Sequence, residues 1–381
     1  MNTKLLALAV AVAGALAAPG VALAQSSVTI SGLFKISIGN YKIGSTLPAR
    51  TGNTSESRMT DDSSRIVFNV VEDLGGGLSA IGQVDWRVAL DNGVDAGGPT
   101  GNVHVGLNSK QWGQIRIGRQ DLHYFNTESN MVIRNDLKAV ATTMLSVIQN
   151  GTCTAAGVCS QVAIGNNTRT PNVVWYRTPD YGGFDVIVAY SFNPVAAQEA
   201  DIGAVARKGR GWNLQPNFKG RNFQVGYSYL SAKQDALAGP DQRGDRLYGS
   251  YDWGGFHVGL AWDRSKLTSA TTGVITNKRT AWSLPVEYKT GPHNILFHYT
   301  KARDDKDTAV QDGARMVAIG YAYDLSKRTS LATTYASIRN DVGAGYNLFG
   351  VSSAAIGTGG TVAAGAGEDP RLWSVTLRHV F

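Results

Sequence analysis

The side chains best suited to nucleophilic or metal chemistry are few in this sequence and lie far apart. None of the histidines is accompanied by a serine and an acidic residue in the pattern of a nucleophile with an ordered base, so a hydrolase is not indicated. The glycine-rich stretches, such as Gly203 to Gly211, do not join a strand to a helix as a phosphate-binding loop does. We therefore expect no enzymatic activity and no cofactor. The histidines are His104, His123, His257, His293, His298 and His379.

The first residues carry the pattern of a secretory signal. Lys4 precedes an apolar stretch from Leu5 to Ala18, and Ala22-Leu23-Ala24 supplies small residues before a cleavage point at Gln25. A transmembrane anchor is the alternative, but the apolar stretch is too short before Pro19-Gly20. We expect residues 1–24 to be removed on export and residues 25–381 to form one domain.

Cys153 and Cys159 are the only cysteines, and five residues separate them. Two thiols with no histidine nearby in the sequence are too few ligands for a metal site. The oxidising periplasm that an exported chain enters favours a disulfide. The pair therefore predicts a disulfide that closes a small loop.

Composition separates this chain from ordinary soluble proteins. Only 17% of its residues are charged, whereas about a quarter is usual, and it has 45 glycines. The formal net charge of +7 is too small to indicate a nucleic-acid partner. Beyond the signal there is no run of about 18 apolar residues, so a helical membrane protein is not expected. No linker or charge block divides the chain, which favours one large architecture.

Apolar and polar residues alternate with a period of two in several long segments. In residues 28–38 the even positions are apolar apart from Gly32 and most odd positions are polar, and similar alternation recurs in 78–88 and 223–229. This period predicts β-strands with one apolar face. Alternation alone does not distinguish a β-sandwich from a membrane barrel, since both have such strands.

The connections between the strands alternate between short and long, which separates the two architectures. Seven short turns rich in Gly, Asp, Asn and Pro alternate with eight long polar segments, and this predicts sixteen strands. An even strand number with short periplasmic turns and long external loops is the plan of an outer-membrane barrel, and sixteen strands enclose an aqueous channel. The long segments are 40–63, 91–101, 120–169, 193–207, 232–243, 266–278, 302–313 and 340–370. We interpret the Gly- and Ala-rich stretch from Val342 to Gly367 as an external loop.

Aromatic residues gather near the predicted strand ends, which is typical of the interfacial girdles of membrane barrels. Examples are Trp86, Tyr176, Phe184, Trp262 and Tyr288. Aromatic residues in the core of a sandwich would instead lie in the middle of strands, facing a second sheet.

Several phrases resemble the general trimeric porins of Gram-negative bacteria, in the branch typical of beta-proteobacteria. The resemblance spans the whole mature chain and implies a homotrimer, with the third long loop, 120–169, folded into each lumen as the constriction. It also implies that Phe381, which ends an alternating strand, is the signal read by the barrel-assembly machinery. The phrases are Ser27 to Gly32, Ser64 to Ile66, Glu72 to Leu78, Ile115 to Gln120, Tyr181 to Phe184, Tyr323 to Thr329 and Leu377 to Phe381.

The candidates for ion selectivity are charged residues at the polar positions of the alternating strands, which would face the lumen. A solute at the narrowest point of a channel sheds water and comes close to such side chains. By resemblance, a ladder of basic wall residues faces the charged loop, and Arg65 and Arg116 fit that ladder best. The sign of these charges favours anions; if the arginines are braced in neutral ion pairs, no preference is expected. The wall candidates are Lys35, Arg65, Asp85, Arg87, Arg116, Arg177 and Asp185, and the loop candidates are Glu128, Arg134, Asp136 and Lys138.

Two other classes of protein compete with a general pore. A secreted adhesin or sandwich lectin explains the export signal and the strands but neither the terminal Phe381 nor the alternating connections. A substrate-specific channel would place a row of aromatic residues along the lumen, whereas that parity is mostly small and charged here. We therefore expect an outer-membrane channel for small hydrophilic solutes and ions, in contact with membrane lipid and lipopolysaccharide.

Overall fold

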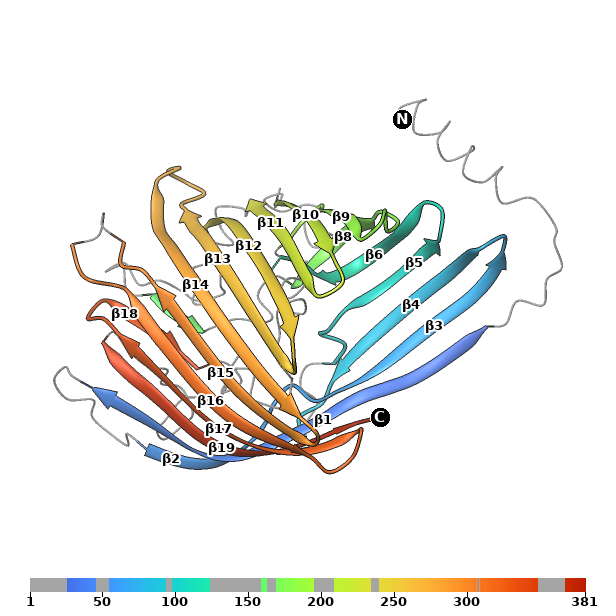
Figure 1. Cartoon of the computed structure of the whole chain (residues 1–381). Helices are drawn as coiled ribbons and strands as arrows, with labels where there is room; N and C mark the ends of the chain where they lie inside the picture. The colour runs from blue at the N-terminus through green and yellow to red at the C-terminus, as the bar shows by residue number, and fades with distance from the viewer. Residues whose placement is uncertain are drawn as a thin grey trace.

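The computed structural model describes residues 26–45, 55–93, 98–123, 159–162, 169–194, 209–233, 240–305, 307, 309–348 and 367–381. Its wall is one antiparallel β-sheet that closes on itself (Figure 1). The described residues contain no helix long and apolar enough to cross a membrane. The wall strands are β1 (Ser27–Ser45), β2 (Ser55–Asp61), β3 (Arg65–Gly75), β4 (Leu78–Arg87), β5 (Val103–Ser109), β6 (Gly113–Asp121), β8 (Arg169–Arg177), β9 (Phe184–Ser191), β10 (Arg210–Lys219), β11 (Phe223–Lys233), β12 (Asp241–Trp253), β13 (Phe256–Thr268), β14 (Ile275–Thr290), β15 (His293–Ala302), β16 (Ala314–Asp324), β17 (Thr329–Asn340) and β19 (Glu368–Val380).

The predicted count of sixteen strands is confirmed once β2 and β3 are recognised as one wall strand. Both pair with β1, but the register changes by one residue between the pairs Ile36–Asp61 and Leu33–Arg65. Ser63, in the break between them, has a positive φ of 72°, which marks a bulge in the strand. The barrel closes where β1 pairs with β19, from Leu33–Val380 to Ser45–Glu368.

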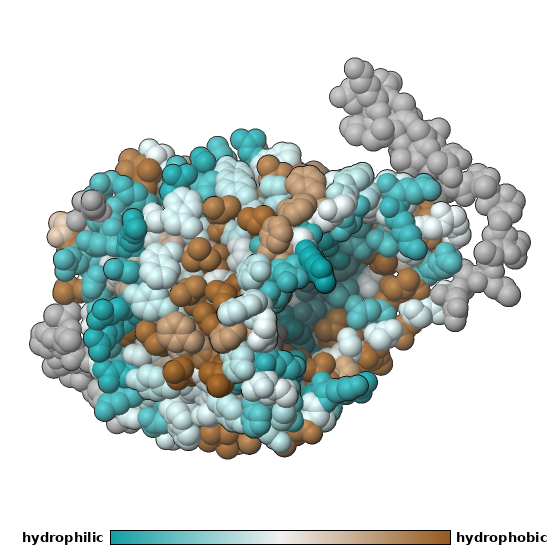
Figure 2. Space-filling model, in the orientation of Figure 1, coloured by the Kyte–Doolittle hydropathy of each residue, from teal (hydrophilic) through white to brown (hydrophobic). Residues whose placement is uncertain are grey.

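The alternating sequence explains why the wall has an apolar exterior. Along β16, Ala314, Met316 and Ala318 face inward and are buried, whereas Val317 and Ile319 between them are exposed. The same alternation runs along β17 and β19. Figure 2 shows hydrophobic side chains gathered over the middle of the visible wall. In a membrane barrel this exposed face is the one that contacts lipid.

The short connections are tight turns, as predicted. The turn between β3 and β4 runs through Gly75, Gly76 and Gly77, which have φ values of 83°, 59° and 78°. Only glycine adopts this left-handed region without strain, so the Gly-Gly-Gly sequence is what allows β3 to reverse directly into β4.

One of the long connections folds back into the barrel. The predicted external loop from Val342 to Gly367 joins β17 to β19, and its described residues up to Leu348 turn inward. Strand β18 (Ala344–Asn347) pairs in parallel with β7 (Cys159–Val162), a strand of the 120–169 segment. Tyr346 and Leu348 are fully buried in a cluster with lumen-facing residues of β14 to β17. The lumen face of those strands is rich in alanine, and its small side chains leave room for an apolar segment to pack there.

Candidate channel lining and constriction

Basic residues of three neighbouring strands form one part of the lumen wall. Arg65 on β3 lies directly opposite Arg87 on β4, and Leu33 on β1 lies opposite Arg65. Lys35 follows two residues further along β1 and is 2% exposed. The Ser64 hydroxyl accepts a hydrogen bond from the Lys35 backbone N–H at 2.9 Å. The structure thus brings Lys35, Arg65 and Arg87 together, as the lumen parity predicts.

Asp85 compensates the charge of Arg87. Arg87 Nη2 donates to Asp85 Oδ2 at 2.8 Å, and both side chains are about nine-tenths buried. The pair is therefore close to neutral for a passing solute. For Arg87 this corresponds to the alternative in which a wall arginine is held in a neutral ion pair.

Arg116 has a different environment on β6. Its guanidinium lies over the ring of Trp175 on β8, 4.5 Å from the ring centroid, and its Nε donates to Gln114 Oε1 at 2.9 Å. Within the described part of the chain, no carboxylate lies within 4.0 Å of Arg116, and the same is true of Arg65. These two arginines therefore keep their full charge toward the lumen.

Arg177 and Asp185 form a bidentate pair between β8 and β9. Arg177 Nε and Nη2 donate to the two carboxylate oxygens at 3.0 and 2.7 Å. Asn217 also donates to Asp185 Oδ1 at 3.0 Å. The sequence predicts that both residues face the lumen, and the structure shows that they compensate each other.

An ion pair that the sequence reasoning missed joins the two ends of the 120–169 segment. Arg169 Nε donates to Asp121 Oδ1 at 2.8 Å, and the two side chains are only 5% and 3% exposed. Arg169 also donates to the carbonyl of Thr100 at 3.1 Å. The charges of both residues act on Arg87, so the pair lies beside the basic wall. Sequence alternation gave no signal for it because Asp121 and Arg169 stand at strand ends, where the ladder register shifts by one residue.

The chain turns into the barrel immediately after β6. Leu122 and His123 are buried, and His123 Nδ1 lies 2.8 Å from Ser228 Oγ on β11. In the wall, β8, β9 and β10 separate β6 from β11, so His123 reaches across the interior instead of following the wall. Burial, and then the charge of Arg246, lower the pKa of His123 well below its usual value. The imidazole is therefore neutral at physiological pH.

A second buried anchor lies on the lumen side of β14. Arg279 donates through Nη1 and Nη2 to the two oxygens of Asp312 at 2.8 and 2.7 Å, and its guanidinium lies 5.9 Å from the ring centroid of Tyr346 on β18. Burial acts to raise the pKa of the Asp312 carboxyl, but hydrogen bonds from Arg279 and from the backbone of Asp305 outweigh it, so the pKa lies below its usual value. Burial raises the pKa of Tyr346 to about 12. Arg279 thus holds the β15–β16 loop and β18 on one side of the lumen.

The loop candidates lie outside the described residues. This applies to Glu128, Arg134, Asp136, Lys138 and Cys153, and for Cys159 only the backbone, in β7, is described. The predicted disulfide and the predicted loop charges therefore stay predictions.

Phe381 closes the barrel at the end of β19. Its N–H donates to the Gly32 carbonyl at 3.2 Å, and its carbonyl accepts from the Gly32 N–H at 2.9 Å. Its ring packs against Phe34 with centroids 4.8 Å apart and covers Gly32, where a Cβ atom would overlap the ring. The terminal aromatic residue thus fits a site on β1 that only glycine leaves open.

Comparison with known proteins decides which family has this architecture. Residues 7–344 match the Gram-negative porin family. The chain belongs to that family. The porin is 27% identical over 383 residues to outer membrane porin protein 32 of Delftia acidovorans, with full coverage of both chains. It is 24% identical over 338 residues to the major outer membrane protein P.IB of Neisseria lactamica, covering 84% of this chain and 91% of that one.

Among solved structures, the porin superposes on the anion-selective porin from Comamonas acidovorans with a TM-score of 0.71. The sequences are 21% identical, and the alignment covers 94% of this chain and all of the other. Family and fold therefore identify an outer-membrane porin that forms a passive channel, and porins are channels rather than enzymes. The expected fold class, the beta-proteobacterial resemblance and the outer-membrane location are confirmed.

Proposed function

We infer that this porin is a general diffusion channel that prefers small anions over cations. The observation that carries the proposal is the incomplete compensation of the arginines between β3 and β9. Arg87, Arg169 and Arg177 each have a carboxylate partner, whereas Arg65 and Arg116 have none within 4.0 Å in the described part of the chain. A lumen wall with excess positive charge raises the local concentration of anions and lowers that of cations. The similar porin of Comamonas acidovorans is anion-selective, which supports the same sign.

We infer that the 120–169 segment forms the constriction. The support is its turn into the barrel at Leu122 and His123, together with the pairing of β7 with β18. Glu128, Arg134, Asp136 and Lys138 would then lie near the narrowest point, and a Cys153–Cys159 disulfide would stiffen the same segment. Labelling of free thiols, followed by mass spectrometry of the porin with and without reductant, tests the disulfide. If the bond exists, the reduced porin should carry two more labels than the unreduced porin.

The remaining partners follow from family membership. We propose that three copies assemble, that residues 1–24 are removed on export, and that the barrel-assembly machinery recognises the strand that ends in Phe381. Lipopolysaccharide is the expected neighbour in the outer leaflet. Cross-linking in whole cells tests the trimer, and N-terminal sequencing of the mature protein tests the cleavage after Ala24.

The selectivity is tested by the reversal potential across a planar bilayer under a potassium chloride gradient. We expect large ohmic conductance steps and a potential of the sign set by chloride. A potential set by potassium would contradict the charge assignment while leaving the channel intact, and absence of conductance would contradict the pore.

A further inference from the structure

A pocket of about 300 Å³ lies in the lumen wall between β6 and β12, at the end of the short turns. Most of its lining side chains belong to the inner face of these strands, among them Arg116, Arg177 and Gln215. The turns that follow β8 and β10 form its rim, through Asp180 and Lys219. Short turns mark the periplasmic side of such a barrel, so we call this cavity the periplasmic pocket.

The periplasmic pocket is separate from the basic wall cluster that includes Arg87. On β4, Arg87 lies four residues from Gln83 on the side of the long loops. Gln83 pairs with His104, and His104 pairs with Gly118. On β6, Arg116 lies two residues beyond Gly118 toward the short turn. Six residues of extended strand therefore separate the two levels, which is about 20 Å along the strand direction.

Arg116 supplies the uncompensated positive charge of the pocket. Its Nε donates to Gln114, but its two terminal nitrogens have no hydrogen-bond partner among the described residues. The guanidinium lies 4.5 Å from the ring centroid of Trp175, which is only 4% exposed and therefore gives it a fixed support. A guanidinium whose terminal edge is open can bind a carboxylate through two parallel hydrogen bonds.

The same pocket contains acceptors that suit a hydrogen-bond donor. Gln215 is 1% exposed, and its Nε2 donates to Asn217 Oδ1 and to the Tyr248 hydroxyl at 3.1 and 3.0 Å. Its Oε1 is buried and has no partner among the described residues, which is costly for a carbonyl oxygen. Asp185, opposite Asn217 on the neighbouring strand, adds a carboxylate that pairs with Arg177.

An occupant that suits this pocket carries a carboxylate together with hydrogen-bond donors. Chloride would satisfy Arg116, but it brings no donor for Gln215 Oε1 and is repelled by Asp185. An ammonium group suits both of these acceptors. A small α-amino acid carries the carboxylate and the ammonium on one carbon atom, and a volume of about 300 Å³ has room for both groups and a short side chain.

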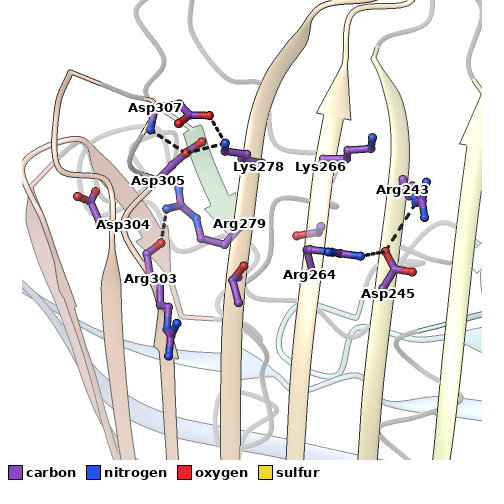
Figure 3. A pocket seen from close by; sticks show the side chains of 12 residues that line it. Arg243, Asp245, Arg264, Lys266, Lys278, Arg279, Arg303, Asp304, Asp305 and Asp307 are labelled. Atoms are coloured by element: carbon purple, nitrogen blue, oxygen red, sulfur yellow. Dashed lines mark hydrogen bonds and ion pairs between the residues drawn. The ribbon is translucent and has the colours of Figure 1, made fainter.

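A charged groove at the loop end of β12 to β15 shows a different arrangement (Figure 3). This groove has a volume of about 570 Å³, and most of the cations that line it are matched by carboxylates of the protein itself. Asp245 lies 3.6 Å from Arg243 and 3.5 Å from Arg264, and Lys278 lies 3.5 Å from Asp305. The periplasmic pocket differs because both its cation and its buried acceptor lack partners in the described part of the chain.

We propose that the periplasmic pocket binds small α-amino acids in their zwitterionic form. The carboxylate lies against the terminal nitrogens of Arg116, and the ammonium donates to Gln215 Oε1 and faces Asp185. This inference rests on the proposed channel function, because the pocket is reached through the water-filled lumen. It adds a saturable binding step to passive diffusion and does not depend on which ions the channel prefers.

The test measures binding by saturation-transfer NMR of the purified mature porin in detergent. The probes are L-alanine and propionate, which has the same carboxylate and chain length but no ammonium. We expect L-alanine to saturate its site. Propionate should bind about tenfold more weakly, because it lacks the charge-assisted hydrogen bond to the buried acceptor.

Two variants each remove one side of the site. Arg116→Gln removes the partner of the carboxylate and Gln215→Met removes the buried acceptor, and each should weaken L-alanine binding about tenfold. Arg65→Gln is the matched control, because it removes the same charge from the lumen at the level of Arg87 and should leave L-alanine binding unchanged. Unboiled gels check that every variant is a folded barrel. If Gln215→Met fails this check, the comparison of L-alanine with propionate on the wild type still tests the acceptor.

Equal binding of L-alanine and propionate by the wild type would overturn the proposal, as would undiminished binding of L-alanine by Arg116→Gln or the absence of any L-alanine binding. The reversal potential of the same preparation separates this outcome from a failure of the proposed function. A chloride-set potential without L-alanine binding overturns the amino-acid site and leaves the anion-preferring channel intact. A potassium-set potential with normal L-alanine binding supports the site and overturns the anion preference.

Discussion

Arg116→Gln gives the sharpest test of how the lumen charges act on ions. Arg116 has no carboxylate within 4.0 Å among the described residues, so its replacement removes one positive charge without leaving a buried partner unpaired. The variant loses the contact of the guanidinium with Trp175, which costs about 1 kcal/mol of folding free energy. A barrel should tolerate this loss, and the main effect should fall on permeation.

The size of that effect follows from Coulomb's law. For an ion about 8 Å from the guanidinium in water, the interaction is about 0.5 kcal/mol. At 0.01 M salt the Debye length is about 30 Å, so about 0.4 kcal/mol remains, which changes the anion concentration about twofold. The cation concentration changes by the inverse factor. The chloride-to-potassium permeability ratio should therefore fall about fourfold, and the change should nearly vanish at 1 M salt, where the Debye length is about 3 Å.

The assay is the reversal potential of the reconstituted porin at low and high salt under the same tenfold gradient. Arg315→Gln is the matched control, since it removes the same charge from the outer face and should leave the ratio unchanged. The reasoning is refuted if Arg116→Gln leaves the ratio at its wild-type value in 0.01 M salt, or if the ratio changes equally at 1 M.

Other predictions concern the anchors and the closure of the barrel. Asp312→Asn removes the charge partner of the buried Arg279, so the unfolding free energy should fall by about 3 kcal/mol in calorimetry. The stability of the wild type should decline as the pH falls through the lowered pKa of Asp312, because protonation removes the same charge. The pKa of His123 is depressed in the folded state, so the stability contributed by its neutral imidazole is complete above about pH 6.5. That stability is lost as the pH falls toward the folded-state pKa of His123. Channel noise should therefore rise on acidification below pH 6 in the wild type, and His123→Gln should abolish this dependence. Gly32→Val places side-chain atoms within the ring of Phe381, so the fraction of heat-modifiable folded barrel on unboiled gels should drop severalfold, whereas Thr29→Val, on the same strand, should leave it unchanged.

The wall could be predicted well from the sequence because period-two alternation and turn chemistry are local signals. Each of the seven short turns falls between the strands expected, and the pairing of β1 with β19 follows from closing an even number of antiparallel strands. The interruption at Ser63 gave no such signal, because a bulge changes the register by one residue and leaves the composition of the strand unaltered.

The residues that line the channel could be predicted from the alternation along the strands, but the ion pairs among them could not. Strand pairing and burial place Lys35, Arg65, Asp85, Arg87 and Arg116 on the inner side of the wall, but which arginines are neutralised depends on distances between neighbouring side chains. The Asp121–Arg169 pair joins residues 48 positions apart, and Tyr346 packs beside Arg279 through a loop that composition marked as external. Tertiary packing decides both.

The seam between β1 and β19 has a consequence for synthesis. The last strand made is the one that covers the free edge of the first, through thirteen residue pairs. A product that stops before Glu368 leaves two open sheet edges, on β1 and on β17, each able to pair with another chain. Premature termination just before the final strand would therefore yield an aggregating product and not a slightly shorter channel, so a stop codon there should be as damaging as one early in the gene.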